Sequence, residues 1–343
     1  MTKGTRYFMI GSTLVIGLGI GTGLVAFYNG ELPMMRSHAG PAELVYVPAD
    51  ASGLAYANVR EIMNSEFRQR IRQLLPTGEG QVELLNQTGI DIEHDIDSVV
   101  AAALAGDNHG LFLVHGRFDE GRIESFVRQH EGTVEEYKGH RLLKPGASST
   151  PGGNGPCITF LETGLAALGE DTSVKQAIDA SLSHENVTKN AELMGYVAQF
   201  EGSQNSAWAV GSFDAIQKHA NLPDQVKANL PAVQWFAVSA HVDGGVNGHL
   251  RAETRDDKSA ADLRAVVNGA LAAAHLVGGK DAKLDALVNS LQVSGTGRDV
   301  ELGFAVSPEM LDLIAGTGVQ GLKPLHDAGK PQDPGKMRDP GKK

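Results

Sequence analysis

The feature that most constrains this chain is an uncharged stretch close to its N-terminus. No charged side chain occurs between Arg6 and Glu31, and the residues between them would extend about 36 Å as a helix, enough to cross a bilayer. Lys3 and Arg6 precede this stretch. Because basic flanking residues stay on the cytoplasmic side, we predict a cytoplasmic segment over 1–6, a transmembrane anchor over 7–30 and export of the remainder.

The glycines of "VIGLGIGTGLVAF" have an alternative interpretation as a nucleotide-binding loop. They alternate strictly at Gly17, Gly19, Gly21 and Gly23, whereas a dinucleotide fingerprint reads G-x-G-x-x-G and a phosphate loop needs Gly-Lys-Ser/Thr. Neither motif matches, and we predict no cofactor. In a membrane helix, glycines four residues apart share one face and allow close helix approach, so these four are the predicted interface with a membrane partner or a second copy. The alternative is that glycine is simply common in membrane helices.

An uncleaved anchor is favoured over a cleaved signal peptide. The apolar stretch exceeds the roughly 7–15 residues of a signal-peptide core, and no small-x-small cleavage site follows it closely. The sequence Ser37-His38-Ala39 is distant, and the only cysteine is Cys157, which excludes a lipid-modified N-terminal cysteine. The expected location is the cell inner membrane, with a single pass and the main domain in the periplasm.

Charge is unevenly distributed along the chain. The net charge is −11. The first six residues contribute +2 and residues 323–343 contribute +3, which leaves −16 on residues 7–322. An acidic body argues against nucleic acid as a partner, because nucleic-acid binding relies on Lys and Arg. The basic Pro/Gly-rich segment 319–343 is predicted to be a disordered tail.

The rest of the chain predicts an α+β fold built from antiparallel hairpins. A strand is expected over Gly53–Asn58, and the hairpins cover 98–118, 133–144, 157–170, 235–254 and a turn at Gly295-Thr296-Gly297. The predicted helices are Arg60–Leu75, a helix capped by Asp119, a helix capped by Asp171, and Asp257–Val277. Their predicted buried stripes include Leu182, Val266 and Ala270.

A short pattern suggests an internal repeat. The segments "VHGRFD" and "AVGSFD" share Gly-x-Phe-Asp at the end of a predicted strand. We therefore predict two related antiparallel units, 42–184 and 185–318, which follow a spacer over 31–41. The glycines of this pattern, Gly116 and Gly211, are expected where backbones pack closely.

No motif in the chain assembles a familiar catalytic or metal site. The segment "DIEHDID", 91–97, imitates the spacing of a calcium loop but has Ile96 in place of its glycine and Ala102 in place of its bidentate Glu. A solvated edge leading into a strand is the favoured interpretation. Cys157 begins an apolar strand and is expected to be buried rather than nucleophilic. We predict no catalytic and no metal-ligating residue.

The structural motifs together resemble a family of uncharacterised bacterial membrane-anchored envelope proteins. The resemblance rests on segments such as "VPADASGLAYANVREIM", "GRFDEGRIESFV", "FLETGLAALGEDTSVKQAID" and "FAVSAHVDGGVNGHLRAE". It implies an envelope protein with an exported domain of strands, helices and hairpins, and it assigns no catalytic residue.

Three functions follow from the sequence. The leading one is a single-pass, membrane-anchored extracytoplasmic protein with a non-catalytic binding or interaction role. The first alternative is an accessory subunit of a membrane complex, docked through the glycine-rich helix. The second is an envelope enzyme with an unfamiliar site, because the geometry of a site is not determined by sequence order.

Overall fold

The computed structural model describes most of the chain between residues 40 and 308. The described residues are 40–74, 85–86, 88–104, 110–144, 146, 156–201, 203–213, 233–278 and 288–308. The predicted N-terminal segment, anchor and tail (1–6, 7–30 and 319–343) lie outside them. None of the helices in the described part combines the length and the apolar character needed to cross a membrane.

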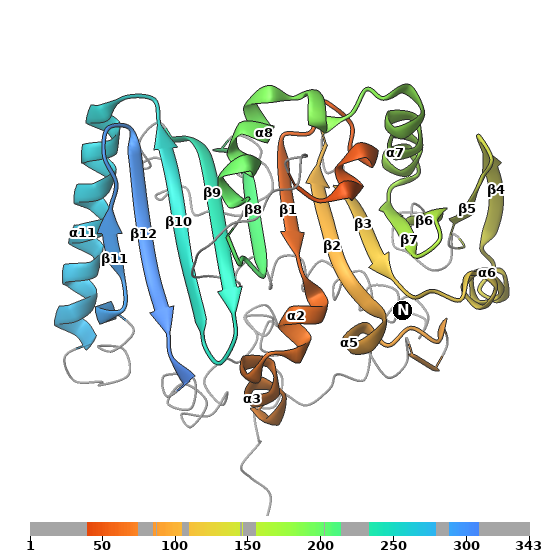
Figure 1. The fold of residues 1–343 in the computed structure, drawn as a ribbon, viewed down its shortest axis with the longest axis horizontal. Helices are drawn as coiled ribbons and strands as arrows, with labels where there is room; N and C mark the ends of the chain where they lie inside the picture. Colours follow the sequence, from red (N-terminus) through yellow and green to blue (C-terminus); the bar gives the residue numbers. More distant parts are fainter. Residues whose placement is uncertain are drawn as a thin grey trace, which may run out of the picture.

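The described strands form one continuous antiparallel sheet (Figure 1). In order across it lie β11 (Gln292–Ser294), β12 (Asp299–Val306), β10 (Val246–Thr254), β9 (Val233–Val242), β8 (Ala207–Ser212), β1 (Gly53–Ala57), β2 (Ile96–Ala103), β3 (Gly110–Gly116), β7 (Leu165–Gly169), β6 (Cys157–Glu162), β5 (His140–Lys144) and β4 (Thr133–Tyr137). The predicted α+β fold with an antiparallel sheet is confirmed.

Helices lie on both faces of this sheet. We call one side the α7 face; its helices are η1 (Ala42–Tyr46), α7 (Asp171–Ser183), η3 (Val187–Lys189), α8 (Ala191–Val197) and η4 (Ala198–Phe200). The other side is the α11 face; its helices are α2 (Val59–Asn64), α3 (Glu66–Leu74), α5 (Ile92–Asp95), α6 (Glu120–Gln129) and α11 (Asp257–Gly278). In Figure 1, α11 lies beside β11 at one end of the sheet and α6 lies beside β4 at the other.

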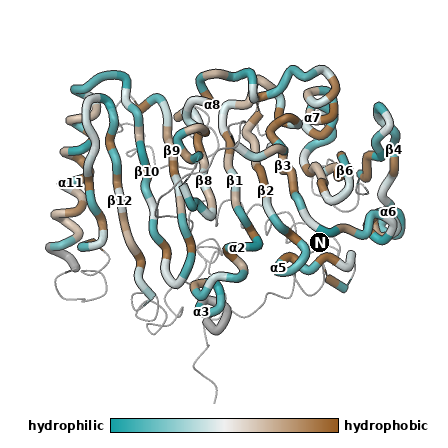
Figure 2. The backbone as a smooth tube through the Cα atoms, in the orientation of Figure 1, coloured by the Kyte–Doolittle hydropathy of each residue, from teal (hydrophilic) through white to brown (hydrophobic). Residues whose placement is uncertain are grey.

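Alternation along the central strands builds a core on both faces. Leu54 and Val100 are buried on the α7 face beneath α7 and η1, whereas Ala57 and Val114 are buried on the α11 face. Successive side chains of a strand point to opposite faces, so strands with apolar residues at both parities need helices on both sides. Figure 2 shows apolar colour on β3 and on part of α7, whereas α6 is mostly polar in colour.

Strand β1 joins the two halves of the sheet. It pairs antiparallel with β2 on one side and with β8 on the other, with Ala55 opposite Ala209 at the centre of the second pair. From this pair outward the order is β1, β2, β3, β7 in one direction and β8, β9, β10, β12 in the other. Gly116 ends β3 while Gly211 lies in β8, so the Gly-x-Phe-Asp match does not align equivalent strands. A common origin of 42–184 and 185–318 stays a prediction.

Positive backbone φ angles mark the predicted hairpin turns. Lys138 and Gly139 have φ of 48° and 88° between β4 and β5, and Gly164 has φ of 82° between β6 and β7. Gly295 and Gly297 have φ of 106° and 56° between β11 and β12. Both central residues of a two-residue type I′ hairpin turn need positive φ, a conformation that glycine adopts readily.

The predicted helix Arg60–Leu75 is divided in two at Ser65. The Ser65 hydroxyl donates to the carbonyl of Ile62 at 2.6 Å and accepts from the backbone N–H of Arg68 at 3.1 Å. Serine side chains compete with the helical backbone for such partners, so Ser65 ends α2 and caps α3.

One predicted helix cap and three predicted buried positions are wrong. Asp119 does cap α6, but the N-cap of α7 is Glu170, and the carboxylate of Asp171 instead pairs with Lys175 and Lys144. Leu182 is 57% exposed and Val266 is 55% exposed, although periodicity placed both on buried stripes; Ala270 is exposed too. The stripe of α11 that packs on the sheet consists of Ala260, Leu263 and Val267.

Gly116 provides a test of backbone packing at the end of β3. A Cβ atom there would lie 2.2 Å from the backbone oxygen of Asp95, whereas a Cβ on Gly269 in α11 would meet nothing within 4 Å. We expect Gly116→Ala to lower the free energy of unfolding by about 1–3 kcal/mol. Gly269→Ala should raise it by about 0.5–1 kcal/mol, because alanine favours helix.

Urea denaturation of both variants measures these changes. A Gly116→Ala protein as stable as the parent would contradict the close approach of β3 to the segment before β2.

Candidate functional site

One half of the α7 face carries polar side chains over strands β9, β10 and β12. We call this surface the open face; its side chains belong to Trp235, Ser239, His241, Asn247, His249, Arg251, Glu253, Asp299, Glu301 and Ala305. Among the described helices, α11 packs along β10, β11 and β12, and it does so on the opposite side. Helix α8 and η4 contact the open face at Trp235, Glu253 and Arg251. The outer part of this surface therefore has no described helix over it.

An aromatic pair forms the boundary between α8 and the open face. The rings of Tyr196 and Trp235 stack with centroids 4.9 Å apart. The indole N–H of Trp235 donates to Glu192 at 3.0 Å, and the hydroxyl of Tyr196 donates to Glu253 at 2.6 Å. Burial, together with the hydrogen bond to Glu253, raises the pKa of Tyr196 above its usual range. Both rings are therefore fixed in orientation.

Ion pairs fix the charged side chains of the neighbouring strands. Arg251 donates to Asp299 at 2.7 Å and also contacts Gln199 of η4. Arg298 pairs with Glu253 at 3.1 Å. Cross-strand pairs of opposite charge stabilise a sheet by about 0.2–1 kcal/mol each. The open face is thus an ordered surface with aromatic, cationic and anionic groups in set positions.

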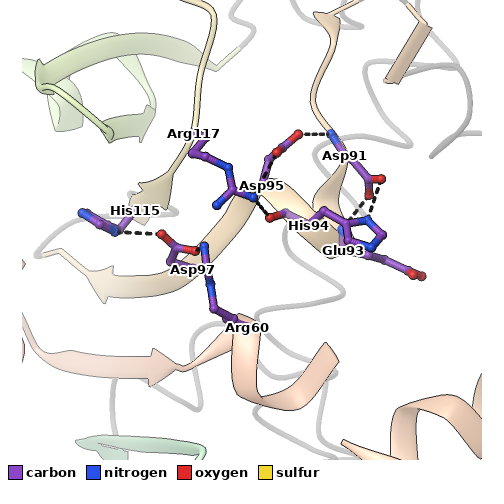
Figure 3. A network of polar contacts seen from close by, with 8 residues as sticks. All are labelled: Arg60, Asp91, Glu93, His94, Asp95, Asp97, His115 and Arg117. Atoms are coloured by element: carbon purple, nitrogen blue, oxygen red, sulfur yellow. Dashed lines mark hydrogen bonds and ion pairs between the residues drawn. The ribbon is translucent and has the colours of Figure 1, made fainter. Parts of the chain in front are cut away.

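A second polar cluster lies at the strand ends near α2 and α5 (Figure 3). Asp97 pairs with Arg60 of α2 and lies 3.6 Å from Nδ1 of His115. Arg117 pairs with Asp95 at 3.3 Å and donates to the carbonyl of His94. These contacts connect α2, α5, β2 and β3.

The calcium-like segment 91–97 is part of this cluster and does not form a loop. Asp91 caps the short helix α5, accepting from the backbone N–H of Glu93 at 3.0 Å. Asp95 and Asp97 pair with arginines, so cationic side chains of the protein already neutralise the carboxylates. Within the described residues no group of three or more potential ligands could hold a metal ion.

A serine, a histidine and two carboxylates meet at the neighbouring strand ends. Their contacts connect elements of the fold and do not form a catalytic arrangement. Ser206 is fully buried; its hydroxyl donates to Glu61 at 2.6 Å and accepts from the N–H of Val242 at 2.9 Å. Nδ1 of His241 lies 3.5 Å from the Ser206 oxygen, and its Nε2 lies 3.8 Å from Asp243. A nucleophile must reach substrate and have a base within hydrogen-bond distance. The buried hydroxyl instead connects α2 to β8 and β9.

Cys157 is buried, as the sequence predicts. Its side chain belongs to the core beneath α7, and burial raises the pKa of the thiol to about 12. A thiol with so high a pKa is a poor nucleophile near neutral pH.

The sequence did not single out the residues of the open face. The predicted interface glycines Gly17, Gly19, Gly21 and Gly23 lie outside the described residues. Alternation in "VNGHLRAET" places the polar residues Asn247, His249, Arg251 and Glu253 on one side of β10. A strand with one polar side is typical of a sheet whose face is solvated on that side, so this pattern could have indicated the open face. Tyr196 and Glu192 come from α8, and only the tertiary structure brings them to Trp235.

The comparisons with known proteins indicate similarity of fold alone. Neither a family model nor a curated protein sequence matches this chain. Crystal form III of TP0453 is similar with a TM-score of 0.50 at 11% identity, covering 81% of this chain and 99% of that chain. Crystal form I of TP0453 gives a TM-score of 0.45 at 11% identity, covering 83% and 100%. A shared fold at this identity transfers no function or residue role.

The Asp91–His94 contact makes part of the stability depend on pH. Burial acts to raise the pKa of the Asp91 carboxyl, but hydrogen bonds from His94, at 2.8 Å, and from the Glu93 N–H outweigh it and hold that pKa below its usual range. A depressed carboxyl pKa stabilises the fold above the unfolded-state pKa, and this contribution is lost as the pH falls through the folded-state value.

We expect Asp91→Asn to lower the free energy of unfolding at pH 6 by about 0.2–1 kcal/mol, the range for an exposed pair. The deficit should shrink as the pH falls below the usual carboxyl pKa of 3.8, because the wild-type carboxyl then becomes progressively protonated. Asp91→Ala also removes the cap of α5, and its deficit should persist at low pH. Equal pH dependence of both variants in urea titrations would contradict the assigned contact.

Proposed function

We propose that this chain is a membrane-tethered, non-catalytic binding protein that presents its open face to a partner outside the cytoplasm. The observation that supports this role most is the open face itself. It is an ordered polar surface with a Trp–Tyr pair and an arginine at one end, and the described helices leave its outer part uncovered.

The composition of the open face suits recognition. Tyr, Trp and Arg are enriched where binding energy concentrates, in positions surrounded by polar residues that limit access of water. Ordering a long side chain on binding costs about 0.5–1.5 kcal/mol. Trp235, Tyr196 and Arg251 are already held by Glu192, Glu253 and Asp299, which reduces that cost.

The described polar clusters favour binding over catalysis. The hydroxyl of Ser206 is buried, and burial raises the pKa of the Cys157 thiol to about 12. The carboxylates of the α5 cluster pair with Arg60 and Arg117. Each of these groups is therefore buried or already paired, and none combines access to substrate with an activating base.

The tether is proposed from the uncharged segment 7–30 and its flanking charges. A reporter that is active only outside the cytoplasm should be active when fused after Lys343 and silent when fused after Arg6. A silent fusion at Lys343, with the protein present in membranes, would overturn the exported topology.

Binding through the open face can be tested by position-specific photo-crosslinking in native membranes. A photoreactive residue at His249, which is exposed on β10, should give a discrete product, whereas one at Val266, exposed on α11, should not. Trp235→Leu should reduce the product at position 249 by several fold, because it removes an anchoring ring. The same product from both positions, or none from position 249, would contradict the proposal.

A further inference from the structure

The carboxylates of the open face are neutralised incompletely by the protein itself. Arg251 and Arg298 pair with Asp299 and Glu253. Glu192 accepts only from the neutral indole of Trp235, and Glu301 accepts only from the hydroxyl of Ser294 at 3.4 Å, among the contacts of the described residues. Neither carboxylate therefore has a direct ion pair with a cation among the described residues, although the charge of Arg251 acts on Glu301 from a distance.

The position of Arg251 explains why Glu301 has no direct ion pair with it. The two residues are opposite each other in the β10–β12 register, yet the guanidinium of Arg251 binds Asp299 and Gln199. Burial acts to lower the pKa of Arg251, but its hydrogen bond to Asp299 and the charges of Asp299, Glu301 and Glu253 outweigh burial and raise that pKa.

The carboxylates of Glu192 and Glu301 lie over strands that are not neighbours. Glu192 lies over β9 through its bond to Trp235, and Glu301 belongs to β12, with β10 between them. Neighbouring strands are about 4.8 Å apart, and Glu301 lies two residues along β12 from Asp299, which is in line with Trp235, so the two sites are at least about 10 Å apart. One small cation cannot contact both, whereas a polypeptide with basic residues two or three positions apart can.

Resting on the proposed function, we infer that the open face binds a basic protein segment whose Lys or Arg side chains contact Glu192 and Glu301. The stacked rings of Tyr196 and Trp235 lie beside the first of these sites and add a surface that attracts cations. The net charge of −16 on residues 7–322 draws such a segment toward the domain.

The test uses the full-length protein in neutral detergent and a fluorescein-labelled peptide of twelve residues with alternating Lys and Ser. A peptide with Glu in place of Lys is the charge control. Fluorescence anisotropy compares Glu192→Gln/Glu301→Gln with Glu120→Gln/Glu136→Gln. The second pair alters Glu120 of α6, which is partly exposed, and Glu136 of β4, which is exposed, at the far end of the sheet, and it changes the net charge equally.

The open-face pair should weaken binding of the Lys peptide by about 2–10-fold, the effect of two exposed charge contacts, and the distant pair by less than about 2-fold. The difference should disappear at high salt, since ions screen exposed charges. Equal losses in both variants would mean attraction to the acidic body in general and would overturn the inference.

Failure of this inference is distinguishable from failure of the proposed function. If crosslinking from position 249 persists while Glu192→Gln/Glu301→Gln leaves peptide affinity unchanged, the open face binds a partner of other chemistry. A crosslinked product of twice the chain mass would identify a second copy. A variant ending at residue 322 tests whether the chain's own basic tail occupies the open face. In that case the product from position 249 has the mass of a single chain, the shortened variant does not form it, and the shortened variant binds the Lys peptide more tightly. This result would overturn an external partner.

Discussion

The antiparallel pairing of β1 with both β2 and β8 is the contact on which the rest of the structure depends. It sets two distant parts of the sequence side by side, with Ala55 opposite Ala209, and joins the strands of the predicted units 42–184 and 185–318 in one sheet. The strand-end contacts follow from it, because α2 begins directly after β1. Arg60 and Glu61 therefore reach Asp97 on one side and Ser206 on the other.

The covering of this sheet decides where a function can lie. Around β1, β2 and β3 both parities are apolar and helices cover both faces. On β10 and β12 only one parity is apolar, so α11 on one side is sufficient and the other side can remain polar. The open face results from this change of pattern along the sheet, and the same alternation places Arg251 and Glu301 on one surface.

Local signals predicted elements better than they predicted sites. The turns at Lys138-Gly139 and Gly295-Thr296-Gly297 were predictable because positive φ restricts the residues allowed there. Periodicity failed at Val266, because it locates a helical face without showing how wide a stripe the sheet contacts. The segment 91–97 is conspicuous in the sequence for its carboxylates, yet the partners of Asp97 and Asp95, Arg60 and Arg117, come from other elements.

The sequence by itself determined the α+β class, the hairpins and the acidic body, because alternation, turn residues and charge are local properties of the chain. It also marked the uncharged segment 7–30 on which the predicted tether rests. Only the tertiary structure decided that β1 pairs with β8, that Ser206 is buried, and that Trp235 stacks on Tyr196. The physical reason is that these contacts join residues distant in sequence, and no local pattern specifies which strand edge or helix face meets another.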